Sequence, residues 1–224
     1  MSETMTLGIC ALCGSRASRA AMPAHLRRCA PSHDRPTGPE SPLYHVRVEG
    51  TGNPIFWLDL EVKAGAKLLQ LDRFLRKTWL ECCGHLSAFY IGGSIYSVVL
   101  DPEFEVMRNE RSMNARVAEV LPERQRFRYE YDFGSTTELT LRVLGTRVGV
   151  TGRSVVRLLA RNEPPVRPCA VCKEPATVVC AFCDDDADPF CCETHAAEHA
   201  CGEEGFLPVV NSPRMGVCGY AGEG

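Results

Sequence analysis

The sequence Ser87-Ala-Phe-Tyr-Ile-Gly-Gly-Ser-Ile-Tyr-Ser-Val-Val-Leu100 contains two runs rich in β-branched and aromatic residues on either side of Gly92-Gly93. Glycine adopts positive φ without a steric penalty, so two glycines between such runs are typical of a tight β-hairpin turn. The sequence therefore predicts a β-hairpin at residues 87–100.

Two further pairs of strands flank this hairpin. Apolar residues occupy every second position in Tyr44–Val48 and in Phe56–Val62, the pattern of half-buried strands. The same alternation returns at 126–133 and 136–148, on either side of Gly134. Each pair is predicted to form a hairpin.

A helical stripe lies between the first two hairpins. Residues Leu68–Leu80 place apolar side chains at positions 68, 69, 71, 74, 75, 79 and 80, with Asp72, Arg73, Arg76 and Lys77 expected on the opposite, solvated face. A single helical turn is expected at 117–122. Residues 43–160 are therefore predicted to form an α+β domain, a mainly antiparallel sheet with one long covering helix.

The sequence Tyr129-Glu-Tyr-Asp-Phe-Gly134, together with the preceding strands, helix and hairpin, resembles the plasmid pRiA ORF-three-like family. That family is named for an open reading frame of a root-inducing plasmid and includes passenger-type proteins of insertion sequences. The resemblance spans Tyr44 to Val148 and implies an α+β fold without a settled activity. Two positions depart from the family pattern. Glu81-Cys-Cys-Gly-His85 replaces an acidic cluster, and 135–138 lacks the usual tryptophan, so a family function carried by those positions would be absent here.

The C-terminal segment, residues 165–224, has the ligand spacing of a two-zinc module. Its eight candidate ligands are Cys169, Cys172, Cys180, Cys183, Cys192, His195, His199 and Cys201. A Cys-x2-Cys turn presents two thiolates to one ion, and zinc prefers four thiolate or imidazole ligands in a tetrahedron. We expect an interleaved arrangement, in which the first and third ligand pairs share one ion and the second and fourth share the other. Cys191 is an alternative to Cys192, because a Cys-x3-His spacing is also acceptable.

Few large apolar residues are available to this segment, chiefly Val178, Val179, Phe182 and Phe190. Burial alone would not offset its chain entropy, so the module is predicted to unfold without zinc. The tail from Leu207 onward is apolar and is expected to fold back onto the module or the sheet. The spacing resembles cross-braced fingers of the B-box, MYND and HIT types, which implies a protein-interaction module.

One motif is typical of an enzyme. The sequence His195-Ala-Ala-Glu198-His199 matches a pattern in which two helical histidines bind catalytic zinc and the glutamate is the general base. A catalytic site keeps an open coordination position for water, whereas eight neighbouring ligands would close both spheres. No nucleophile-elbow or phosphate-loop motif is present either. The sequence therefore favours a protein that is not an enzyme.

A third zinc site is predicted at the N-terminus. Cys10-x2-Cys13 is followed by His25-x3-Cys29, the spacing of a finger whose knuckle gives two thiolates and whose helix, beginning near Pro23, gives two ligands one turn apart. We predict a finger at residues 1–30 and a proline-rich linker at 31–42. The chain is thus expected to hold three zinc ions.

Charge suggests two classes of partner. The overall net charge is −3, but four arginines surround the N-terminal finger, whereas the C-terminal segment is acidic. The leading hypothesis is a zinc-binding protein–protein adaptor. The alternative is a nucleic-acid-associated accessory factor, linked to mobile genetic elements, that contacts phosphates or bases through Arg16, Arg19, Arg27 and Arg28.

The remaining cysteines carry no complete local motif. Cys82, Cys83 and His85 follow the predicted helix, and Cys218 lies in the tail. Buried packing is the commonest role of such residues, with a metal site or a reactive thiol as alternatives. With no secretory leader and no apolar run long enough to span a bilayer, the expected location is cytoplasmic, without membrane contact.

Overall fold

The structure is a computed structural model that describes residues 6–98, 109–121, 123–183 and 187–222. The chain divides into two compact units. The first, here called the sheet unit, comprises Met1–Leu75 and Leu86–Glu163. The second, called the C-terminal unit, comprises Arg76–His85 and Pro164–Gly224. Among the described residues, no helix is both long enough and apolar enough to span a bilayer.

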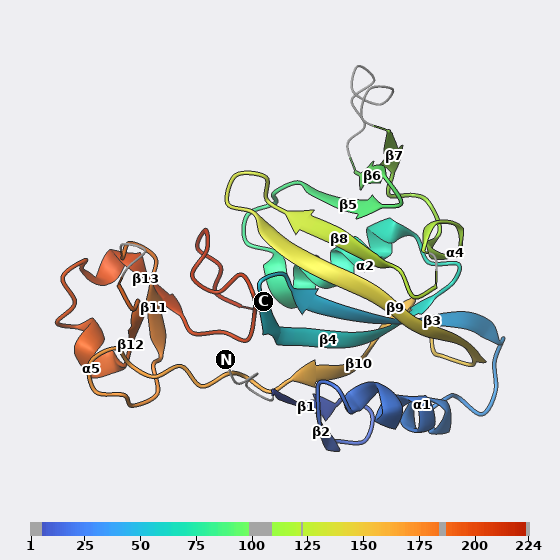
Figure 1. Ribbon diagram of the computed structural model, residues 1–224, viewed down its shortest axis with the longest axis horizontal. Coiled ribbons are helices and arrows are strands. Elements are labelled where there is room, and N and C mark those ends of the chain that lie inside the picture. Colours follow the sequence, from blue (N-terminus) through green and yellow to red (C-terminus); the bar gives the residue numbers. More distant parts are fainter. Residues whose placement is uncertain (1–5, 99–108, 122, 184–186, 223–224) are drawn as a thin grey trace. The chain divides into compact units, whose positions relative to one another are not determined.

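The sheet unit is built on one large sheet of ten strands (Figure 1). Their order is β2-β1-β10-β4-β3-β9-β8-β5-β6-β7, and every pair is antiparallel except β6 with β7. The strands are β1 (Leu7–Cys10), β2 (Arg16–Ser18), β3 (Ser41–Gly50), β4 (Asn53–Lys63), β5 (Ser87–Ile91), β6 (Ser94–Ser97), β7 (Glu110–Ser112), β8 (Arg126–Tyr131), β9 (Thr137–Gly149) and β10 (Val156–Asn162).

All three predicted hairpins are confirmed, as β3–β4, β5–β6 and β8–β9. The glycine pair has φ values of 57° and 81° at Gly92 and Gly93, as the tight turn requires. Residues 99 and 100 of the predicted returning strand lie outside the described part of the chain. The α+β class also holds, but the sheet is larger than predicted because β1, β2 and β10 extend it.

The predicted helix is present as α2 (Leu68–Leu75), followed directly by a π-helical turn, η1 (Arg76–Leu80). The expectation that Asp72 faces solvent is wrong. Its side chain is 1% exposed, and its carboxylate accepts hydrogen bonds from the hydroxyls of Tyr129 and Ser87. These two donors compensate the cost of burying the carboxylate and fix α2 to β8 and β5. The expected turn at 117–122 appears as α4 (Val117–Val120).

The N-terminal finger segment is part of the large sheet. β1 pairs with β10, and α1 (Met22–Ser32) packs its buried residues Met22 and Leu26 into one cluster with Trp57. Gly8 permits this approach, since a β-carbon there would collide with the ring of Trp57. α1 ends two residues inside the segment predicted as linker, and β3 starts at Ser41, which leaves 33–40 between them.

Ion pairs fix the end of this segment to the sheet. Asp34 forms a two-pronged pair with Arg147, at 2.7 and 2.8 Å, and Arg147 also donates to the buried carboxylate of Glu61 at 2.6 Å. The neighbouring guanidinium of Arg147 holds the pKa of Asp34 below its ordinary value. The charged pairs therefore fix the segment between α1 and β3 against β9 and β4.

The C-terminal unit has little regular structure. A three-stranded sheet in the order β12-β11-β13 is its largest element. Its elements are β11 (Val178–Cys180), β12 (Phe190–Cys191), α5 (Glu193–Ala196), η2 (Glu203–Gly205) and β13 (Phe206–Pro208). After β13 the chain returns along this sheet. The amide of Val209 donates to Thr177, and Gly216 lies against the side chain of Val179.

Candidate metal centres

The structure brings the predicted ligands together in three groups. Within each group the candidate ligand atoms all lie within 4.8 Å of one another. Each group offers three thiols and one imidazole: Cys10, Cys13, His25 and Cys29; Cys169, Cys172, Cys192 and His195; Cys180, Cys183, His199 and Cys201. All the cysteines are free, so no disulfide competes for these sulfurs.

The distances fit tetrahedral zinc. With zinc–sulfur bonds of about 2.3 Å and zinc–nitrogen bonds of about 2.0 Å, a tetrahedron places two sulfurs about 3.8 Å apart and a sulfur and a nitrogen about 3.5 Å apart. The Sγ atoms of Cys10 and Cys29 are 3.8 Å apart, as are those of Cys172 and Cys192. The sulfur–nitrogen distances run from 3.2 Å for Cys192–His195 to 3.6 Å for Cys169–His195. One ion of this size fits each group.

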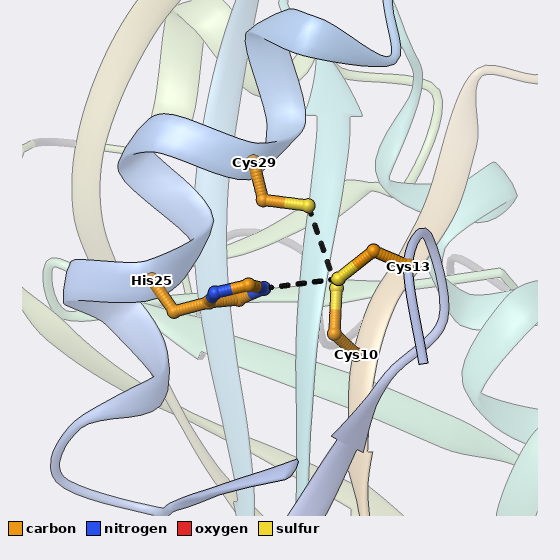
Figure 2. Close-up of side chains that lie close together, drawn as sticks. All are labelled: Cys10, Cys13, His25 and Cys29. Carbon is orange, nitrogen blue, oxygen red and sulfur yellow. Dashed lines mark hydrogen bonds between the residues drawn. The ribbon is translucent and has the colours of Figure 1, made fainter. Parts of the chain in front are cut away.

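The N-terminal group combines a strand, a turn and a helix (Figure 2). Cys10 ends β1, and the chain then turns through Gly14, which has φ of 75°. The amide of Gly14 donates to the carbonyl of Cys10, and the amide of Cys10 donates to the carbonyl of Ser15, which closes the knuckle. His25 and Cys29 lie one turn apart on α1, so both side chains point to the same place, as Figure 2 shows. Both elements are anchored in the sheet unit, which fixes the position of the group.

In the C-terminal segment, the first and third ligand pairs lie together, as do the second and fourth. This is the interleaved arrangement expected from the spacing. Cys192 precedes α5 and lies 3.2 Å from His195, which is on that helix. Cys191 belongs to β12, is buried and lies outside every group. Successive side chains of an extended segment point in opposite directions, so only one of these neighbours can face the ion.

The two histidines of the His-x-x-Glu-His sequence lie in different groups. His195 is with Cys169, Cys172 and Cys192, whereas His199 is 3.3 Å from Cys183. α5 ends at Ala196, so the histidines do not share one helix face. A catalytic zinc with both histidines as ligands needs them on one ion. The arrangement therefore gives no support to the metallohydrolase reading.

Thiol acidity differs within each group. Hydrogen bonds from Ser15 lower the pKa of Cys13 to about 6, and a backbone hydrogen bond from Cys172 leads those that lower the pKa of Cys169 to about 6. Burial, followed by the neighbouring thiols, raises the pKa of Cys29 and of Cys183 to about 12. Thiols of the second kind stay protonated at neutral pH unless a cation draws the proton off.

A fourth group consists of Cys82, Cys83, His85 and Cys218, with its ligand atoms also within 4.8 Å of one another. The sequence favoured buried packing as the role of these residues. The closely spaced Cys82, Cys83 and His85 are visible in the sequence, but Cys218 is separated from His85 by 133 residues. Local spacing therefore did not indicate the group.

The four N-terminal arginines differ in availability. Arg16 pairs with Glu163, and Arg19 with Glu49 at 3.1 Å. Arg27 and Arg28 are exposed on α1, beside the N-terminal group. Half of the predicted basic surface is thus partly neutralised by carboxylates of the same chain.

Metal removal should affect the two units differently. A strong chelator should abolish amide protection across 165–208, where few described side chains are buried, and leave β3, β4 and β9 protected, since the large core surrounds them. Hydrogen–deuterium exchange with peptide-level readout measures both regions in one sample. Retained protection of 165–208 after elemental analysis has shown the metal to be gone would contradict this expectation.

Replacing one of two adjacent cysteines should separate their roles. After dialysis against a competing chelator, Cys192→Ser should contain one zinc ion fewer than the wild type, because it removes a thiolate from a four-ligand group. Cys191→Ser is the matched control and should keep the full content. Elemental analysis decides between them, and equal losses in both variants, or loss in Cys191→Ser alone, would refute the assignment.

Comparison with known proteins adds a family. A family model described as plasmid pRiA4b ORF-3-like protein matches residues 43–167. Among solved structures, the chain is similar to a protein of unknown function, MM3350 from Methanosarcina mazei Go1, with 16% identity, 54% of this chain and 67% of that chain covered, and a TM-score of 0.41. The curated proteins contain no match. Since the family model covers more than half of the sequence, the chain belongs to the plasmid pRiA4b ORF-3-like family.

Proposed function

We propose that the protein is a zinc-binding interaction protein. Zinc ions bound by three Cys₃His groups would stabilise the surfaces that bind a protein partner. The observation that carries this proposal is the donor set. Each group offers four soft or borderline ligands within 4.8 Å, which suits zinc and leaves no coordination position for water or substrate. Closed sites of this kind are structural rather than catalytic.

The three zinc knuckles share a sequence, Cys-Ala-apolar-Cys, which suggests where the partner binds. The apolar residue is Leu12 in the first knuckle, Val171 in the second and Phe182 in the third. Leu12 packs against the buried cluster of the sheet unit. Val171 and Phe182 are 65% and 63% exposed. The C-terminal knuckles thus expose the residue that the N-terminal knuckle partly buries, and exposed aromatic and aliphatic tips are typical anchors of protein interfaces.

Charge on the C-terminal unit indicates the chemistry of the partner. Exposed carboxylates lie on the same unit at Glu174, Asp188 and Glu204. An apolar segment flanked by lysine or arginine would match both the knuckle tips and these carboxylates. We therefore propose that the C-terminal unit binds a basic, partly apolar segment of another protein.

Substitution of the knuckle tips should remove the partner without removing zinc. We expect Val171→Ser combined with Phe182→Ser to reduce capture of specific partners by about tenfold or more, as loss of interface anchors does. Quantitative mass spectrometry of proteins captured from cells of the source organism compares this variant with the wild type. Val148→Ser, which changes a residue 60% exposed in the sheet unit, is the control. An identical set of captured proteins for all three would refute the proposal, provided that zinc content is unchanged.

The alternative function is nucleic-acid contact through α1. Its specific support is the exposure of Arg27 and Arg28 next to the N-terminal zinc group. The ion pairs of Arg16 and Arg19 weaken it, since those guanidinium groups already have carboxylate partners. One finger reads only about three base pairs, so contact of this kind would have low sequence specificity.

A DNA-binding measurement tests this alternative. If it holds, the full chain should shift short duplex or single-stranded DNA at low salt, the shift should weaken as salt rises, and Arg27→Ala plus Arg28→Ala should abolish it. A charge-matched control, Arg126→Ala plus Arg153→Ala, should bind as the wild type does, because those exposed arginines lie elsewhere on the sheet unit. Absence of any shift at low salt would rule the alternative out.

A further inference from the structure

We infer that Cys82, Cys83, His85 and Cys218 form a fourth zinc site, which joins the segment after η1 to the C-terminal tail. All four residues belong to the C-terminal unit. The site goes beyond the three groups of the proposed function and does not depend on them. With it, every cysteine of the chain except Cys191 belongs to a Cys₃His group.

The geometry of this group matches that of the other three. The Sγ atoms of Cys82 and Cys83 are 3.6 Å apart and those of Cys83 and Cys218 are 3.8 Å apart. A tetrahedral zinc site requires about 3.8 Å, whereas a disulfide requires about 2.0 Å. The Nε2 atom of His85 lies 2.9 Å from the sulfur of Cys83 and 3.3 Å from that of Cys218. The imidazole nitrogen and the thiols thus converge on one point.

Local backbone structure positions the first three ligands. The amide of Glu81 donates to the carbonyl of Arg76 and closes the π-helical turn, and the side chains of these residues also form an ion pair at 2.6 Å. The other carboxylate oxygen of Glu81 accepts a hydrogen bond from the amide of Gly84, at 2.7 Å. Gly84 has φ of 81°, a conformation that suits glycine and reverses the chain between Cys83 and His85.

Contacts of the tail position the fourth ligand. The hydroxyl of Ser212 donates to the carbonyl of Trp79 at 2.6 Å, and both residues are buried. Cys218 has φ of 50°, which is uncommon for a residue other than glycine, and the next residue, Gly219, has φ of 69°. This backbone conformation, held by the contacts around it, places the sulfur of Cys218 beside Cys83 and His85.

A buried cation accompanies the group. Arg214 is 0% exposed, and one of its N–H groups lies 3.5 Å from the sulfur of Cys82. Burying a guanidinium is costly unless negative charge lies nearby. Three thiolates and a neutral imidazole around a zinc ion carry a net charge of −1, which complements Arg214.

The packing interpretation, which the sequence favoured, does not account for these residues. Cysteines whose role is packing in a core are buried, as Cys191 is at 2% exposure. In contrast, Cys83 and Cys218 are exposed. Exposed thiols gathered around a histidine are explained by a shared ion and not by burial of apolar surface.

The consequence is a long-range cross-link. The chain leaves the sheet unit after Leu75, runs through 76–85 and returns at Leu86. An ion that bridges Cys83 and Cys218, which are 135 residues apart, would fix this excursion to the tail. A cross-link that closes so long a loop restricts the unfolded chain and stabilises the folded tail.

Zinc content of the full chain tests the site. After dialysis of reduced protein against a competing chelator, Cys83→Ser combined with Cys218→Ser should contain one zinc ion fewer than the wild type. Substituting two of the four ligands leaves only two, which weakens retention of the ion more than a single substitution would. Cys191→Ser is the control and should not differ from the wild type. An unchanged zinc content in the double variant overturns the inference.

A second measurement needs no variant, in case the double variant fails to fold. In the metal-loaded wild type, N-ethylmaleimide should modify Cys83 and Cys218 slowly although both are exposed, because zinc-bound thiolates are poor nucleophiles. Chelation should raise their modification rates about tenfold or more, as peptide mass spectrometry measures. Fast modification of these cysteines before chelation would overturn the site. A disulfide between them that persists in the presence of a reductant would also overturn it.

Discussion

The pairing of β10 with both β4 and β1 is the constraint on which the arrangement of the sheet unit depends. Through β10, the N-terminal strands become members of the large sheet, and α1 can pack its apolar face against Trp57. The N-terminal group of ligands is therefore built on a buried core. Its knuckle residue Leu12 is part of that packing, which explains why this knuckle has no exposed apolar tip.

The C-terminal unit is constrained in another way. In its cysteine-rich part, residues 165–208, the three short strands and the single four-residue α-helix bury few apolar side chains among the described residues, so burial contributes little to the stability of that part. Bound zinc would replace the missing core, because structural zinc sites contribute on the order of 10 kcal/mol to folding. Such a unit can leave apolar residues exposed at its knuckles. A unit stabilised by burial alone would need them inside.

The family motif has a structural role in this chain. Tyr129 is buried and donates to Asp72, while Asp132 takes a positive φ of 64° and accepts a hydrogen bond from the amide of Gly134. These contacts fix α2 and end β8. In the segment Glu81–His85, the structure places three of the four residues of the proposed fourth zinc site.

The sequence by itself determined the local elements. Strand alternation, the glycine pair and the helical stripe identified three hairpins and α2, because each pattern reflects the environment of neighbouring residues in the chain. Paired cysteines identified most candidate ligands for the same reason. Only the tertiary structure decided the pairing of β1 with β10, the burial of Asp72, the choice of Cys192 over Cys191 and the approach of Cys218 to Cys83. Each of these depends on residues far apart in the chain or on the direction of one side chain, and neither is encoded in a local spacing.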